Sequence, residues 1–214
     1  MPGVSQEEFF EQIKSALADR GEPVDLPDDV EISRAISPHD DLVEVFMARV
    51  EQAGMNAYRV DNEQQVSDKI AEIIEEAGGK SAIVTDEKIP GREQFMNELQ
   101  QKGIQLKDMS DADAAFDADF GITAVNSAIA ETGSICLTSG QDRRRMASLA
   151  VPNHIAVVRA DLIIPDLLEW IADQSKDLPA NAVLVSAPSK TADIEMILVH
   201  GVHGPKEEHI IIVG

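Results

Sequence analysis

The sequence predicts an α/β fold, in which a mostly parallel β-sheet is flanked by helices and preceded by a helical arm. Two observations lead to this prediction. From residue 56 onward, short apolar runs typical of buried strands alternate with longer amphipathic stretches at helical spacing. Glycine follows each of the first helical patterns, at Gly54, at Gly78–Gly79 and at Gly103. Strands that alternate with helices in this way form parallel sheets covered on both faces.

Residues 1–36 are predicted to form the helical arm and a linker, and residues 37–214 the α/β domain. Ser5 and Glu8 make a capping box at the start of an amphipathic helix that runs to Gly21. Its apolar residues at helical spacing are Phe9, Ile13, Ala16 and Leu17. Two interpretations of this helix stay open: it faces a partner, or it packs on its own domain. Between Glu22 and Ser33, two prolines and several acids indicate an irregular linker.

The α/β domain is expected to open with a helix that has Ser37 as its N-cap and Pro38 in its first turn. The predicted strands that follow are Asn56–Val60, Ser81–Thr85, Ile104–Leu106, pieces of Gly121–Gly140, His154–Val158, Ala182–Ser186 and His209–Val213. The predicted helices between them are Asn62–Ala77, Gly91–Lys102, Pro165–Gln174 and one that opens at Ser189.

The chain is strongly acidic, with 18 lysines and arginines against 39 aspartates and glutamates and a formal net charge of −21. Such a surface repels phosphate backbones and anionic lipid headgroups, so no nucleic acid or membrane surface is expected as a partner. No segment reaches the roughly 18 apolar residues of a membrane span, and the acidic N-terminal stretch does not resemble a signal peptide. A cytoplasmic protein without membrane insertion is therefore expected.

Cys136 is the only cysteine. It excludes an intrachain disulfide, and it cannot alone supply the four thiolates of an iron–sulfur cluster. Its apolar neighbours Ile135 and Leu137 favour a small buried hydrophobe over a nucleophile. No cofactor is expected in this chain, and any redox centre would belong to a partner.

The first candidate site lies in the run Gly121–Gly140, where Glu131, Thr132, Gly133 and Ser134 interrupt two apolar pieces. A carboxylate and two hydroxyls then lie at a bend. Glycine permits a positive φ there, and free backbone N–H groups beside the hydroxyls would bind an anion. The alternative is a strand interrupted by a bulge, with Glu131 merely solvated.

The second candidate site begins where Ser189, Lys190 and Thr191 are predicted to open a helix after a strand. Unsatisfied N–H groups and the positive end of the helix dipole favour an anion at such a place. A plain serine N-cap is the alternative.

The same segment continues to His203 and Gly204, in a glycine-flanked loop. His203 is a candidate hydrogen-bonding or proton-transferring group, because imidazole titrates near physiological pH. Metal ligation by His200 and His203 is disfavoured, since Gly201 breaks the helix that would align them, and no metal site is predicted. The alternative interpretation of this loop is a helix C-cap followed by a turn into the last strand.

Arg143, Arg144 and Arg145 are conspicuous in so acidic a chain. They form either a clamp for a carboxylate or phosphate, or surface charge paired with neighbouring acids.

The two runs AIAETGSICL and SKTADIEMILVHGVHGP resemble the signatures of the LutC/YkgG family, whose LUD domain is named for lactate utilisation. The resemblance covers most of the chain from about Ser37 onward. It implies a NagB/RpiA/CoA-transferase-like fold, a Rossmann-like α/β sandwich. It also implies a place in a system that oxidises L-lactate to pyruvate, with iron–sulfur clusters on sister proteins.

The sequence leaves three alternative functions for this chain. The first is a LutC-like subunit that binds a small anionic ligand beside lactate-utilisation iron–sulfur partners, with Glu131 and His203 as catalytic groups. Its ligand-binding residues would be Thr132, Gly133, Ser134, Ser189, Lys190, Thr191 and Gly204. The second is a free-standing CoA-transferase-like or sugar-phosphate-binding enzyme that uses Glu131, an analogy with other members of the fold group. The third is a non-catalytic scaffold or regulatory subunit, and a homo-oligomer is possible in each case.

Overall fold

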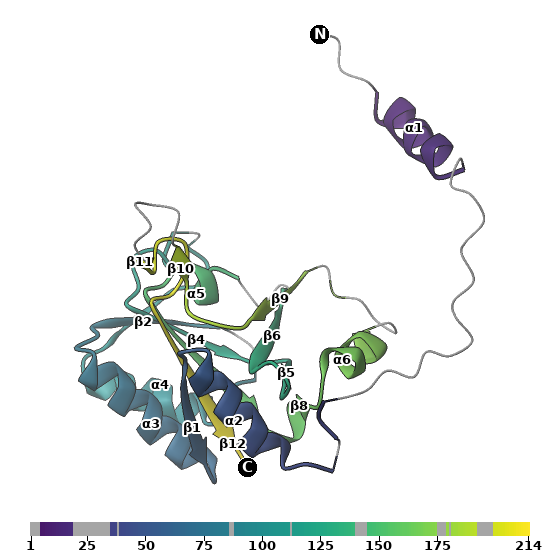
Figure 1. Cartoon of the computed structure of the whole chain (residues 1–214). Coiled ribbons are helices and arrows are strands. Elements are labelled where there is room, and N and C mark those ends of the chain that lie inside the picture. The colour runs from purple at the N-terminus through teal and green to yellow at the C-terminus, as the bar shows by residue number, and fades with distance from the viewer. Residues whose placement is uncertain are drawn as a thin grey trace. The chain divides into compact units, whose positions relative to one another are not determined.

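The computed structural model describes residues 5–18, 35–37, 39–85, 88–111, 113–139, 145–174, 179, 181–191 and 199–214. The chain divides into two compact units, Met1–Ser33 and Arg34–Gly214 (Figure 1). This division falls close to the predicted boundary after residue 36. No helix in the described ranges combines the length and the apolar character that a bilayer span requires.

The first unit contains helix α1, Gln6–Ala18. Its capping box is confirmed, because the Ser5 N–H donates to Glu8 Oε2 at 2.9 Å and the Glu8 N–H donates to Ser5 Oγ at 3.2 Å. These bonds lower the pKa of the Glu8 carboxyl. Phe9, Phe10, Ile13 and Leu17 are all exposed. The predicted end at Gly21 and the linker Glu22–Ser33 lie outside the described residues.

A six-stranded sheet forms the centre of the second unit, in the order β1-β12-β7-β4-β2-β3 (Figure 1). Every neighbouring pair is parallel. The strands are β1 (Asn56–Val60), β2 (Ser81–Val84), β3 (Gln105–Lys107), β4 (Phe120–Ala124), β7 (Asn153–Arg159) and β12 (Glu207–Val213). The predicted parallel sheet is confirmed. Five of the strands predicted with bounds agree with it to within one or two residues, and β4 is one of the pieces predicted for the run Gly121–Gly140.

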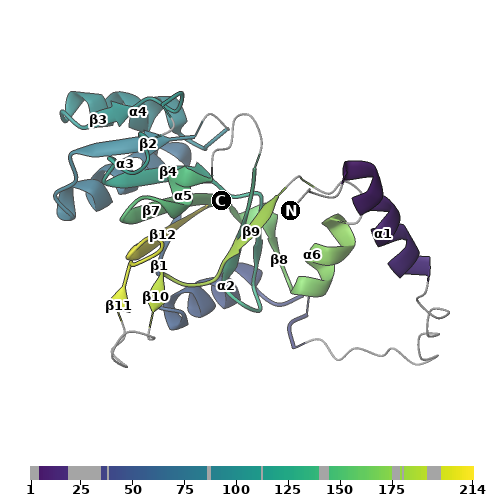
Figure 2. The ribbon, with the colours of Figure 1, turned by 90° about the horizontal axis from the view of Figure 1, so that it is seen from above.

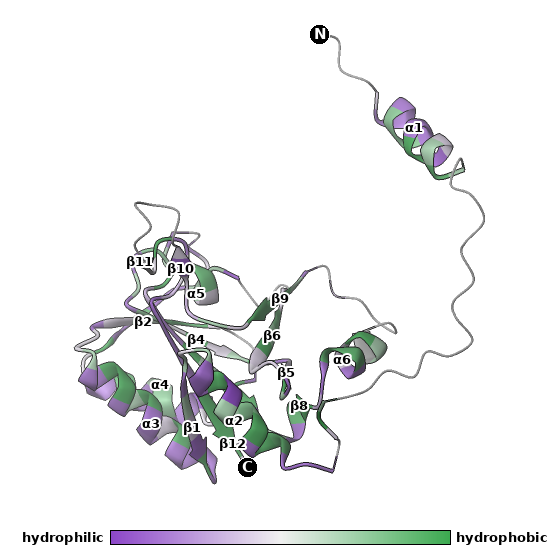
Figure 3. Cartoon of the chain, viewed as in Figure 1, coloured by the Kyte–Doolittle hydropathy of each residue, from purple (hydrophilic) through white to green (hydrophobic). Residues whose placement is uncertain are grey.

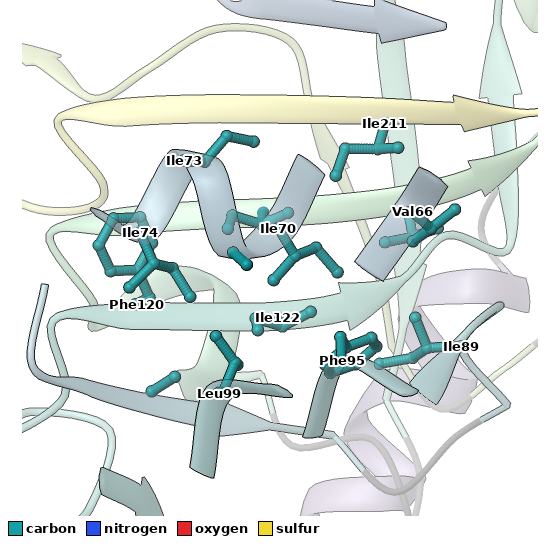
Figure 4. Packing of buried hydrophobic residues seen from close by; sticks show 14 of the residues in the cluster. Val66, Ile70, Ile73, Ile74, Ile89, Phe95, Leu99, Phe120, Ile122 and Ile211 are labelled. Atoms are coloured by element: carbon teal, nitrogen blue, oxygen red, sulfur yellow. The ribbon is translucent and has the colours of Figure 1, made fainter. Parts of the chain in front are cut away.

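Helices α3 (Glu63–Glu76) and α4 (Arg92–Gln101) cover one face of this sheet (Figure 2). Asn62, where this helix was predicted to begin, is the N-cap of α3, since its side chain accepts the Gln65 N–H at 3.1 Å. The helices are amphipathic, with hydrophilic and hydrophobic bands visible in Figure 3. The core between helices and sheet includes Ile70, Ile74, Phe95, Leu99, Phe120 and Ile122, all fully buried (Figure 4).

The opposite face is covered by helix α2 (Leu42–Gln52) and by a second sheet. The second sheet has the order β8-β5-β6-β9. Its strands are β5 (Ser127–Ile129), β6 (Ser134–Thr138), β8 (Ile163–Ile164) and β9 (Ala182–Val185). Successive residues of β7 show the two-sided burial, because Ile155 belongs to the α3–α4 core and Ala156 to the core beneath the second sheet.

The second sheet corrects the bulge interpretation of the Gly121–Gly140 run. After β4, the chain leaves the parallel sheet and forms an antiparallel hairpin of β5 and β6. The partner of β6 on its other side is β9, which lies far along the chain and is also antiparallel. A local sequence pattern does not reveal a pairing between segments so far apart. The bend at Glu131–Ser134 was therefore predicted, but the second sheet that produces it was not.

The start of α2 also differs from the prediction. Ser37 is not its N-cap, because α2 begins at Leu42 and the Asp41 side chain accepts the Glu44 N–H at 3.2 Å. Ser37 instead belongs to a preceding turn, in which its N–H donates to Asp40 Oδ2 at 2.8 Å. The remaining short elements are α5 (Met146–Leu149), a 3₁₀ turn (Ala160–Leu162), α6 (Leu167–Gln174), β10 (Lys190–Thr191) and β11 (Val199–His200).

Cys136 is fully buried in β6, as predicted. Burial raises the pKa of its thiol, and the side chains of Trp170 and Ser127 offset part of that rise.

Asp119 ties the starts of β2 and β4 together. Its Oδ2 accepts the N–H groups of Lys80 at 2.8 Å and Ser81 at 2.9 Å, and the Ser81 hydroxyl at 3.0 Å. The Lys80 N–H, followed by the Ser81 groups, holds the pKa of the Asp119 carboxyl below its ordinary value.

We expect Asp119→Asn to lower the free energy of unfolding at pH 7 by about 1–2 kcal/mol, because the charged acceptor is lost. A carboxyl with a depressed folded-state pKa stabilises the fold above its unfolded-state pKa, and the stabilisation is lost as pH falls through the folded-state value. Urea unfolding at pH 7 and pH 3 should therefore show a smaller difference from wild type at pH 3. Asp117→Asn, at an exposed position, is the control, and an equal loss at both pH values would contradict the assignment.

Candidate functional site

The first predicted segment forms the tip of the β5–β6 hairpin. The Glu131 N–H donates to the Pro165 carbonyl at 2.9 Å, and the Gly133 N–H donates to the Ile129 carbonyl at 2.9 Å. The Ser134 N–H donates to Thr132 Oγ1 at 3.3 Å. These three N–H groups are thus engaged within the fold and do not form the open anion cradle that the sequence suggested.

Gly133 is required where the hairpin tip meets α2. Its φ is +68°, in the left-handed region that favours glycine. A Cβ at this position would lie 2.7 Å from the Val50 nitrogen and 2.8 Å from the Arg49 carbonyl carbon. The hairpin therefore packs backbone against backbone on the C-terminal half of α2.

A row of three hydroxyls runs from the hairpin tip to the end of β9. Thr132 Oγ1 and Ser134 Oγ lie 2.7 Å apart, and Ser134 Oγ and Ser186 Oγ also lie 2.7 Å apart. Ser134 is buried, whereas Thr132 and Ser186 at the two ends of this hydroxyl row are exposed. Each hydroxyl donates one hydrogen bond and accepts others, so the row can pass a hydrogen bond to a ligand oxygen at either end.

The second predicted segment does not open a helix. Lys190 and Thr191 form β10, which pairs antiparallel with β11. The Ser189 N–H donates to the Pro205 carbonyl, and the Ser189 carbonyl accepts the Gly201 N–H, both at 2.9 Å. These bonds hold residues 189–191 extended against the following loop, so no helix N-terminus exists there to bind an anion. Residues 192–198, which were predicted to continue the helix, lie outside the described residues.

Lys190 connects this segment to α2. Its Nζ donates to the Ala53 carbonyl at 3.2 Å, at the residue that caps the end of α2. A cation at this place stabilises the negative end of the helix dipole. Because Gly133 packs on Arg49 and Val50 of the same helix, both predicted segments contact the last turns of α2.

His203 and Gly204 line a cleft of about 520 Å³, here called the His203 cleft. The cleft is lined by residues of the loop 201–206 and of the segment 146–152, and by Phe116. These segments precede β12, β7 and β4, so the cleft lies at the amino ends of the parallel strands. The hairpin tip and residues 189–191 are not among the described residues that line it. Ser189 joins the two regions, because its Oγ accepts the His203 N–H at 3.4 Å.

Of the three adjacent arginines considered as an anion clamp, Arg143 and Arg144 lie outside the described residues. Arg145 is exposed, and its carbonyl accepts the Ser148 hydroxyl at 2.9 Å at the start of α5. Within the described ranges, no group of three or more His, Cys, Asp or Glu side chains is placed to hold a metal ion.

Comparison with known proteins decides the family. The model of the LUD domain matches residues 43–213, which include both predicted segments. The chain belongs to the LUD domain family. It is 30% identical over 187 residues to lactate utilization protein C of Halalkalibacterium halodurans, across 82% of this chain and 74% of that protein. It is 28% identical over 189 residues to lactate utilization protein C of Oceanobacillus iheyensis, across 81% and 80% of the two chains.

A solved structure agrees with this assignment. A DUF162 family protein from Deinococcus radiodurans matches with a TM-score of 0.61 and 25% identity, across 86% of this chain and 99% of that one. The resemblance drawn from the two sequence runs is thus confirmed at the level of the family and the fold.

The LUD domain also contains a buried polar chain that the sequence analysis missed. His154 Nδ1 lies 2.7 Å from Glu208 Oε2, and His154 Nε2 lies 3.0 Å from Thr123 Oγ1. The three side chains belong to the adjacent strands β7, β12 and β4, and each is at most 3% exposed. The sequence carries a signal for this pair. His154 and Glu208 each lie near the start of an apolar strand, and an ionisable side chain that is buried there needs a partner.

Two residues of this buried chain follow the lining of the His203 cleft closely in the sequence. Lys206 and Pro152 line the cleft, and the Lys206 N–H donates to the Pro152 carbonyl at 2.8 Å. Glu208 lies two residues after Lys206, and His154 lies two residues after Pro152. Glu208 and His154 are paired in the register of β12 and β7. The buried pair is therefore close in sequence to the residues that line the cleft.

We expect Gly133→Ala in the LUD domain to destabilise the fold by about 3 kcal/mol or more, because a Cβ adds a clash with α2 to the strain of a positive φ. Gly103→Ala is the matched control, since Gly103 has φ +78° with nothing within 4 Å of the added Cβ. It should cost only about 1 kcal/mol. Urea unfolding of both variants measures the two losses in the free energy of unfolding. Equal losses would show that the close approach of Gly133 to α2 adds nothing to the cost of the substitution.

We expect His154→Leu and Glu208→Leu each to cost about 3–5 kcal/mol, because each leaves a buried partner unpaired. The double variant should cost clearly less than the two single losses together, as measured by a double-mutant cycle in urea. Strict additivity would mean that the 2.7 Å contact contributes nothing to stability.

Proposed function

We propose that this chain is a LutC-like component of a lactate utilisation system and supports the oxidation of L-lactate to pyruvate. The observation that carries the proposal is the match to lactate utilization protein C of H. halodurans, which extends over 82% of this chain. The LUD domain match over residues 43–213 supports it.

The proposed electron acceptors are iron–sulfur partner proteins. Conversion of L-lactate to pyruvate removes two electrons and two protons, from the hydroxyl group and from the carbon that bears it. The sole cysteine, Cys136, cannot ligate a cluster alone and is fully buried. We therefore assign the clusters to partner proteins and a ligand-binding role to this chain.

We place the anionic ligand in the His203 cleft. Lys206 supplies a positive charge for a carboxylate, and His203 supplies an imidazole for the hydroxyl proton. Ser189 fixes the loop by accepting the His203 N–H. The cleft therefore offers a charge for one end of a 2-hydroxy acid and a proton acceptor for the adjacent hydroxyl.

Glu131 remains a candidate in this proposal, in a different position. It lies at the hairpin tip beside the hydroxyl row, and the tip packs on the last turns of α2, where Lys190 also binds. Because the hairpin tip is not among the described residues that line the His203 cleft, its carboxylate would act on the partner that receives the electrons.

We expect His203→Ala to abolish or strongly slow growth on L-lactate in a host that lacks its own copy and any paralogue, because the proton acceptor is lost. His39→Ala, which removes an exposed histidine ahead of α2, should support wild-type growth. Glu131→Gln is tested in the same assay. Full growth with both His203→Ala and Glu131→Gln, at normal protein levels, would refute the catalytic proposal and favour a scaffold.

A further inference from the structure

The His203 cleft is larger and more apolar than lactate needs. Its volume is about 520 Å³, within the range of sites that bury drug-sized ligands. A molecule of a few heavy atoms such as lactate would leave most of that volume to water.

Most of the residues that line the cleft are apolar. Met146, Leu149 and Val151 come from one segment, and Phe116, with 62% of its surface exposed, also lines the cleft. On the opposite loop, Val202 is also exposed, at 40%. Exposed large apolar side chains gathered around a cleft are typical of a site that receives an apolar group.

Lys206 is the positively charged residue among those that line the cleft. The aliphatic stem of Lys206 lies across Gly201, which has φ +73° and no Cβ to obstruct it. The Lys206 backbone is fixed by its bond to the Pro152 carbonyl. Among the described residues, no carboxylate forms an ion pair with Lys206. In a chain of net charge −21, such a cation is suited to an anion from outside.

We infer that the cleft accepts 2-hydroxy carboxylates with apolar side chains longer than the methyl group of lactate. The carboxylate binds Lys206, the hydroxyl faces His203, and the side chain lies along Leu149, Val151 and Phe116. This inference rests on the proposed function, since it names the substrate class of the same cleft.

Calorimetric titration of the purified full chain tests it with L-lactate, (S)-2-hydroxybutyrate, (S)-2-hydroxyhexanoate and (S)-2-hydroxyoctanoate. Each added CH₂ should tighten binding by about two- to fourfold, as burial of a methylene group predicts. Leu149→Ala and Phe116→Ala should reduce this gain per carbon. Lys206→Gln should weaken all four acids by a similar factor, while Lys88→Gln, the same charge change at an exposed site, should not.

Affinity that does not rise with chain length would overturn the inference. So would unchanged binding by Lys206→Gln, because the carboxylate would then lie elsewhere. The growth assay separates this failure from that of the proposed function. If affinity is flat while His203→Ala still prevents growth on L-lactate, the lactate role stands and only the longer substrates are excluded.

Discussion

The central strands β4, β7 and β12 must be covered on both faces, and the rest of the second unit follows from this constraint. Their side chains alternate between two cores, and both cores are apolar. Helices α3 and α4 fill one side. The other side needs more surface than α2 alone provides, so the chain leaves the parallel sheet after β4 and folds a second sheet over it. That layer lies so close to α2 that only glycine fits at residue 133.

The polar groups of the LUD domain gather where the parallel strands begin. Asp119 joins the starts of β2 and β4, His154 and Glu208 pair near the starts of β7 and β12, and Lys206 lies directly before β12. The buried pair fixes the relative position of β7 and β12 at this edge, because each partner is unfavourable without the other. The loop 201–206, which lines the His203 cleft, leads directly into β12. The cleft is therefore built next to a firmly held part of the sheet.

Local patterns predicted most of the parallel sheet, since each strand and covering helix is encoded within its own dozen or so residues. The Ser5–Glu8 capping box is an example, because a cap acts within one helical turn. One failure is local, because Asp41 rather than Ser37 caps α2. The other failures involve partners far along the chain. β6 pairs with β9, Ser189 is held by Gly201 and Pro205, and His154 meets Glu208 across 54 residues. In the candidate site, His203 and Gly204 were found by their loop, whereas Lys206 and the apolar wall emerged only from the fold.

The shielding of Cys136 gives the protein a built-in reporter. Its thiol is the only one in the chain, it is inaccessible, and burial raises its pKa. An alkylating reagent can therefore reach it only after the second sheet has separated from its surroundings. The rate of labelling then measures how often that layer opens, without any introduced probe, and a ligand or partner that clamps the layer would slow the labelling in proportion.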